Sequence, residues 1–160
     1  PHIKLLIVGS PFSARTQQSV FQRKLEQQAK SLGNRVQFTG YIPNEDLPDY
    51  YRLADLCCVP TLVEEAAGLV AVEAMACGLP VVGSNEGGLP EFINSQVGTL
   101  VSPEDEEAFC AAILNELTRH HTEPERRDII AHYASSNFAQ AQFVEKLEQV
   151  YQRAVRDFSG

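Results

Sequence analysis

Residues 64–82 read E-E-A-A-G-L-V-A-V-E-A-M-A-C-G-L-P-V-V, and this stretch decides how the chain folds. Its centre holds a single charged residue, Glu73, among residues that favour helix. Gly78 stands where a helix commonly ends in a left-handed glycine, and Pro80 follows where a helix cannot continue. The stretch therefore predicts a helix that starts near Gly68 and leads into a strand.

A helix that begins at a glycine offers a site for an anion, because its first N–H groups lack partners and its dipole favours negative charge. Glu65 would stand in the loop just before that terminus, and Glu73 would lie inside the helix. A carboxylate on an otherwise apolar helix needs a partner, since an unpaired buried charge is costly. Sugar hydroxyls would serve both glutamates, and a phosphate would serve the N–H groups. The pattern therefore suggests a nucleotide-sugar site.

The spacing of the two glutamates also has a simpler interpretation. Glu65 could be a solvated loop residue that favours the helix N-terminus, and Glu73 could lie on the exposed face of the helix. Structural ion pairs also explain such residues. From spacing alone, the simpler interpretation is favoured.

The same stretch resembles the nucleotide-sugar-binding motif of the retaining glycosyltransferases of family 4, which have the GT-B fold. In that motif a glutamate, seven residues and a second glutamate are followed by A-M-A-x-G-x-P-V-V, and Glu65 and Glu73 to Val82 match it. Three residues between the glutamates depart from the commoner Gly, Phe and Pro: Ala66, Ala67 and Val70. These departures change the side-chain packing expected against the sugar and leave both carboxylates in place.

The resemblance implies a role for each part of the site. Glu65 would be the catalytic carboxylate that orients the donor hexose, and Glu73 would bind the ribose hydroxyls. The backbone groups implied in donor binding are those near Tyr41 and Ile42, for the nucleobase, and those of Ala67, Gly68 and Leu69, for the phosphate.

Short apolar runs alternate with helical segments along much of the chain. This alternation predicts an α/β fold with a Rossmann-like parallel sheet and flanking helices. The expected strands are 3–8, 35–39, 56–59, 80–83 and 97–101, and the expected helices are 17–32, 44–54, 68–77, 90–93, 104–119, 124–135 and 139–158. Ligands of such sheets bind at the carboxyl ends of the strands. The segments expected to gather there are Gly9, 40–42, Thr61, 65–69 and 85–88.

Three further features have open interpretations. Gly87 and Gly88 could form a tight turn with a helix cap, or could donate backbone N–H groups to a sugar, and both weigh equally. The final helix, 139–158, has an apolar stripe, which is more simply explained by packing on its own sheet than by a partner. His120 and His121 are expected to form a surface pair favoured by the helix dipole, rather than to bind a metal.

The composition excludes several classes of function. A formal net charge of −8 argues against a nucleic-acid partner held through its phosphates. Four cysteines without a C-x-x-C pair argue against a disulfide scaffold or a zinc site and favour a reducing compartment.

No apolar run reaches the ~18 residues of a membrane span. No D-x-D motif occurs, so we expect no metal ion and no cofactor besides the donor. The expected location is the cytoplasm, with the inner face of the membrane as an alternative.

Residues 1–160 are therefore expected to be the C-terminal, donor-binding domain of a longer two-domain enzyme. By the resemblance, that enzyme would move a hexose from a UDP- or GDP-linked donor to a saccharide or lipid-linked acceptor, with retention of configuration. The acceptor would bind to an N-terminal domain. The alternatives are a nucleotide-sugar epimerase of the same architecture and a non-catalytic nucleotide-binding module.

The 160-residue chain is predicted to lack transferase activity by itself. The resemblance implies an Arg and a Lys that neutralise the pyrophosphate, and neither has a match here. The measurement compares turnover of this chain with turnover of the longer parent enzyme on the same donor and acceptor. Full activity of the chain alone would contradict the prediction.

Overall fold

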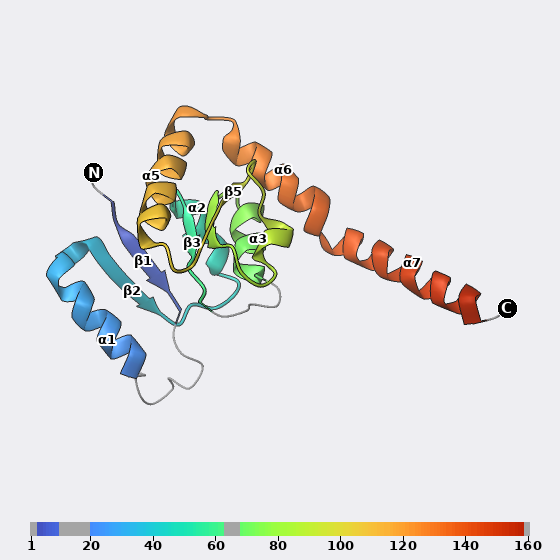
Figure 1. Cartoon of the computed structure of the whole chain (residues 1–160), viewed down its shortest axis with the longest axis horizontal. Coiled ribbons are helices and arrows are strands. Elements are labelled where there is room, and N and C mark those ends of the chain that lie inside the picture. Colours follow the sequence, from blue (N-terminus) through green and yellow to red (C-terminus); the bar gives the residue numbers. More distant parts are fainter. Residues whose placement is uncertain (1–2, 10–19, 63–67, 159–160) are drawn as a thin grey trace. The chain divides into compact units, whose positions relative to one another are not determined.

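The computed structural model describes residues 3–9, 20–62 and 68–158. Its internal contacts divide the chain into two compact units, Pro1–Leu47 and Pro48–Gly160. They are called here the N-terminal unit and the C-terminal unit, and each is described by itself. Figure 1 colours the elements of both units in chain order, from blue to red.

The N-terminal unit contains two parallel strands. Its elements are β1 (Leu5–Val8), α1 (Val20–Ala29), a 3-10 helix (Lys30–Arg35) and β2 (Val36–Gly40). In the pairing of β1 with β2, Leu5 lies opposite Val36 and Ile7 lies opposite Phe38. Both strands lie where the alternation of apolar runs predicts them. The predicted helix over 17–32 ends earlier, because the chain tightens into the 3-10 helix after Ala29.

The C-terminal unit contains a second sheet with helices around it. Its elements, starting with the helix that spans the boundary, are α2 (Leu47–Leu53), β3 (Cys57–Val59), α3 (Leu69–Ala76), β4 (Val81–Ser84), α4 (Leu89–Phe92), β5 (Gly98–Val101), α5 (Glu106–Thr122), α6 (Arg126–Phe138) and α7 (Gln140–Phe158). The strand order is β3-β4-β5, and all pairings are parallel. Parallel strands that alternate with helices confirm the expected α/β class, here as two separately paired sheets.

Successive residues of β4 face opposite sides of its sheet, as the pleat requires. Val81 belongs to a buried cluster with residues of α3 and α6, including Met75 and Ile130. Val82 belongs to a second cluster with Ala112 of α5. Helices α3 and α6 therefore cover one face of the sheet, and α5 covers the other. This layering agrees with the positions of these elements in Figure 1.

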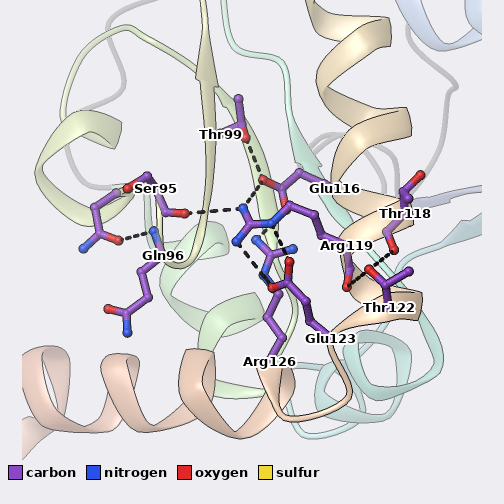
Figure 2. A network of polar contacts seen from close by, with 10 residues as sticks. Ser95, Gln96, Thr99, Glu116, Thr118, Arg119, Thr122, Glu123 and Arg126 are labelled. Carbon is purple, nitrogen blue, oxygen red and sulfur yellow. Dashed lines mark hydrogen bonds and ion pairs between the residues drawn. The ribbon is translucent and has the colours of Figure 1, made fainter.

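A buried polar network joins α5 and α6 to β5, as Figure 2 shows. Glu116 of α5 is fully buried and accepts a hydrogen bond from the Thr99 hydroxyl at 2.6 Å. Its other carboxylate oxygen pairs with Arg126 of α6, which is 2% exposed. Arg119 lies 3.5 Å from Glu116, and its guanidinium also donates to the carbonyl of Ser95. The charges of Glu116 and Arg126 are therefore buried as a pair.

The predicted start of the second helix differs from the structure. The sequence suggests that Asn44 caps a helix, but residues 44–46 form a turn and α2 begins at Leu47. The turn is closed by a hydrogen bond from the Asp46 N–H to the Pro43 carbonyl at 3.0 Å. This local hydrogen bond holds residues 43–46 in a turn, so the helix begins only after them.

The interpretation that the final helix covers its own sheet is wrong for the described residues. Helix α7 contains no buried residue, and its Phe143 and Val150 are 65% and 62% exposed. The edge of the core is closed instead by α6, where Phe138 lies with its ring centroid 5.2 Å from that of Phe92. None of the helices in the described part of the chain has the length and apolar character needed to cross a bilayer.

The expected surface pair of histidines is also wrong for one member. The side chain of His120 is 12% exposed, and its Nε2 lies 3.7 Å from a carboxylate oxygen of Asp55. Burial lowers the pKa of His120, and the nearby Arg127 lowers it further. His121 is exposed, as expected, and its ring packs edge-on against the ring of His120. Packing of the α5 terminus, rather than the helix dipole, sets the environment of His120.

Replacing Glu116 by Ala is predicted to destabilise the chain by roughly 3 kcal/mol, because it leaves the buried Arg126 guanidinium with only a 3.9 Å contact to the half-exposed Glu123. The measurement is urea denaturation followed by circular dichroism. Asn115→Ala, an exposed change on the same helix, is the matched control and should shift the free energy of unfolding by less than about 0.5 kcal/mol. Equal effects of the two substitutions would contradict the assigned role of the network.

Candidate functional site

Helix α3 begins at a glycine that adopts a left-handed conformation. Gly68 has φ 49° and ψ 34° and precedes the first helical residue, Leu69. A Cβ atom at Gly68 would lie 2.7 Å from a methyl carbon of Leu89. Gly68 itself is buried, whereas Leu69 and Val70 are 64% and 45% exposed. The first N–H groups of a helix have no acceptor within the helix, so this turn is a candidate site for an anion.

The other end of α3 is closed as the sequence predicts. Gly78 has φ 78° and donates its N–H to the Met75 carbonyl at 2.9 Å. The N–H of Leu79 donates to the Ala74 carbonyl at 3.0 Å. Together these two bonds form a Schellman motif, which ends the helix and satisfies its last carbonyls. The predicted helix from Gly68 to its glycine cap is confirmed.

The turn after β4 lies beside the start of α3. Gly87 has φ 56°, and Gly88 is the N-cap residue of the short helix α4. The first residue of that helix is Leu89, whose side chain touches Gly68. The interpretation of Gly87 and Gly88 as a turn and cap is therefore confirmed. Donation of their N–H groups to a sugar stays a prediction.

Glu73 lies on the face of α3 that points away from the core. It is exposed, whereas Ala71, Ala74 and Met75 are completely buried. The simpler interpretation, in which Glu73 lies on the exposed face of the helix, is therefore confirmed for this residue, because the helix buries its opposite face. Leu69 and Glu73 are four residues apart and share one face, so the carboxylate lies one turn beyond the open N-terminus.

The Glu73 carboxylate nevertheless has a partner. The hydroxyl of Tyr51, on α2, donates a hydrogen bond to Glu73 Oε2 with an O···O distance of 2.9 Å. Burial raises the pKa of Tyr51, and the hydrogen bond to Glu73 raises it further, so the phenol stays protonated at neutral pH. The sequence shows Tyr51 only as an apolar position of a helix. Its contact with Glu73 depends on how α2 packs beside α3.

A cysteine thiol adjoins this pair of side chains. Burial, together with the nearby Cys58 and Glu73, raises the pKa of Cys57 to about 12. Cys57 therefore stays neutral at physiological pH and adds no second negative charge beside Glu73.

The N-terminal unit carries the remaining predicted residues that the structure describes. The N–H of Gly9 donates to the carbonyl of Gly40 at 3.0 Å, where β1 and β2 reach their carboxyl ends. Tyr41 follows directly and is 75% exposed, whereas Ile42 is partly buried. Gly9, Tyr41 and Ile42 thus lie together at the strand ends of that unit, as the sequence predicts, and the contact of Tyr41 and Ile42 with a nucleobase stays a prediction.

Glu65 and Ala67 lie outside the described residues, so their roles as catalytic carboxylate and phosphate donor stay predictions. Within the C-terminal unit, the structure brings Gly68 and Leu69 beside the Gly87–Gly88 turn. Among residues 3–9, 20–62 and 68–158, no three His, Cys, Asp or Glu side chains are grouped closely enough to hold a metal ion. Donor binding without a metal also stays a prediction.

Comparison with known proteins identifies a family. A sequence model described as glycosyl transferases group 1 matches residues 1–136. The D-inositol 3-phosphate glycosyltransferase of Mycolicibacterium smegmatis is 35% identical over 159 residues, which is 99% of this chain and 36% of the relative. The lipopolysaccharide 1,2-N-acetylglucosaminetransferase of Salmonella typhimurium is 34% identical over 80% of this chain and 33% of the relative. The chain thus spans about a third of these relatives.

Solved structures show the same fold. Sucrose-phosphate synthase from Thermosynechococcus elongatus superposes with a TM-score of 0.80 at 33% identity, covering 96% of this chain and 39% of the synthase. Anabaena HepE in complex with UDP-glucose superposes with a TM-score of 0.77 at 27% identity, covering 96% of this chain and 42% of HepE. These similarities confirm the expected Rossmann-like half of a GT-B enzyme.

Replacing Gly68 by Ala is predicted to destabilise the chain by roughly 1 to 3 kcal/mol, through the left-handed backbone and the contact with Leu89. The measurement is thermal denaturation of the variant and of the unchanged chain. Unchanged stability of Gly68→Ala would contradict both the backbone strain and the close contact.

Proposed function

Because this chain belongs to the glycosyl transferases group 1, we propose that it binds a nucleoside diphosphate sugar for a longer enzyme that transfers a hexose with retention of configuration. The names of the relatives support transfer rather than epimerisation, since both are glycosyltransferases. The HepE structure holds UDP-glucose, which supports a uridine donor. A non-catalytic module is disfavoured for the same reasons.

The observation that carries the proposal is the geometry of α3. Its first turn begins after the buried Gly68, beside the Gly87–Gly88 turn, and Glu73 lies one turn further on an exposed face. A helix N-terminus suits a diphosphate, and a carboxylate accepts hydrogen bonds from sugar hydroxyls. The two features lie about one helical turn, roughly 5.4 Å, apart along the helix axis. Both donor groups would thus be held by a single rigid element.

The proposed chemistry follows from charge. When the bond between the anomeric carbon and the diphosphate oxygen breaks, the electron pair leaves with the diphosphate, and the departing oxygen gains negative charge. Helix N–H groups at Gly68 and Leu69 that already point at this group would stabilise that charge and lower the barrier. Glu65 would orient the hexose, and its carboxylate would favour the positive character that develops at the anomeric carbon. Glu73 would hold the ribose.

The acceptor belongs to the part of the enzyme beyond this chain, since the chain spans only about a third of its relatives. A saccharide or lipid-linked acceptor fits the proposal. A cytoplasmic location is part of it too, and is supported by the four cysteines Cys57, Cys58, Cys77 and Cys110, which are free thiols, as a reducing compartment favours.

Titration calorimetry with UDP-, GDP- and ADP-glucose is the direct measurement of donor binding. We expect one of these donors to bind, and Glu73→Ala to weaken that binding at least about tenfold, because the ribose hydroxyls lose a charged acceptor. Glu145→Ala, which removes an exposed carboxylate on α7, is the matched control and should leave the affinity unchanged. Binding that is unaffected by Glu73→Ala would point to a nucleotide-binding module of another kind.

A further inference from the structure

Glu73 is an exposed carboxylate on a long, flexible side chain. A free glutamate loses about 1.5 to 2 kcal/mol of side-chain entropy when a ligand immobilises it. A partner that restricts the side chain beforehand reduces this loss and improves affinity. The described part of the chain supplies one such partner for Glu73, the hydroxyl of Tyr51.

Tyr51 is well suited to hold another side chain in place. Its ring packs against the buried core cluster that includes Ala74 and Met75 of α3. Only its hydroxyl needs to reach the surface, where it meets Glu73 Oε2 at 2.9 Å. Helix α2 therefore presents a fixed donor to the exposed face of α3. The two residues are 22 positions apart in the sequence, so their contact is a product of the tertiary fold.

The hydrogen bond from Tyr51 leaves acceptor positions of the Glu73 carboxylate for a ligand. A carboxylate has two oxygens that together accept about four hydrogen bonds. The Tyr51 hydroxyl uses one of these positions, on Oε2. Among the residues that the structure describes, none is hydrogen-bonded to Oε1, so its acceptor positions remain for donors from a ligand, and two neighbouring hydroxyls of a ribose are such donors. The nearby Cys57 is a neutral thiol, so it does not compete with the Glu73 carboxylate as acceptor of the hydrogen bond from Tyr51.

We propose that Tyr51 is a positioning residue, which orients the Glu73 carboxylate so that its second oxygen is available to the ribose hydroxyls of the bound nucleotide. This inference deepens the proposed function and rests on it. Tyr51 itself does not touch the nucleotide in this arrangement. Its contribution should therefore depend on Glu73 and on the ribose hydroxyls, and not on the diphosphate or the base.

The test compares Tyr51→Phe with the unchanged chain. The substitution removes one oxygen and keeps the ring in the core. The ligands are whichever of UDP, GDP and ADP binds tightest, and the 2′,3′-dideoxy form of the same nucleotide, called here the deoxy form, which has neither ribose hydroxyl. We expect Tyr51→Phe to bind the ribose form about tenfold more weakly, as the loss of a hydrogen bond to a charged group implies, and the deoxy form about equally well. The melting temperature should stay within a few degrees.

Two further variants complete the test. Glu73→Gln should also weaken the ribose form, and the double variant with Tyr51→Phe should be no weaker than Glu73→Gln alone, because the two residues act as a unit. Tyr50→Phe is the matched control on α2, since no hydrogen bond joins the Tyr50 hydroxyl to another described residue. It should bind both nucleotides as the unchanged chain does.

The outcomes separate this inference from the proposed function. If the unchanged chain binds none of the three nucleotides, or if Glu73→Gln has no effect, the proposed function fails and the inference fails with it. If Glu73→Gln weakens binding but Tyr51→Phe does not, only the inference fails. Equal weakening of the ribose and deoxy forms by Tyr51→Phe, with a lower melting temperature, would assign Tyr51 a purely structural role and also overturn it.

Discussion

The close packing of α3 against its sheet is the constraint on which the rest of the structure depends. Ala71, Ala74 and Met75 have no exposed surface, and two of them are small enough for the helix backbone to approach the strands closely. Once this face is buried, the helix has only one rotation about its axis. The same rotation opens the first turn to solvent and turns Glu73 outward. The candidate site is thus the outer face of a core helix.

Glycines hold both ends of this helix in place. Gly68 lies against Leu89 of α4, and a Cβ atom at Gly78 would lie 2.9 Å from the carbonyl of Arg127 in α6. A side chain at either position would clash with a neighbouring helix, so the two glycines allow α3 to pack closely against α4 and α6. A site built on such an element keeps its donors and acceptors in fixed positions, which favours tight recognition of a ligand.

The network around Glu116 supports this arrangement from the other side of the sheet. It joins α5 to the start of α6, and α6 in turn contributes Ile130 and Ala134 to the cluster that buries α3. Buried ion pairs add little net stability, because the loss of hydration offsets their attraction. They do penalise arrangements in which one partner is left alone. The network therefore favours one packing of α6, and through α6 one position of α3.

The sequence by itself determined the local features of this protein. Strand and helix positions follow from apolar spacing, and the ends of α3 follow from Gly68 and Gly78, because these effects act between residues close along the chain. Only the tertiary structure decided which face of α3 is buried, that Tyr51 is the partner of Glu73, and that the stripe of α7 is left exposed. Such contacts join residues far apart in the sequence. They depend on the packing of whole elements, which periodicity does not specify.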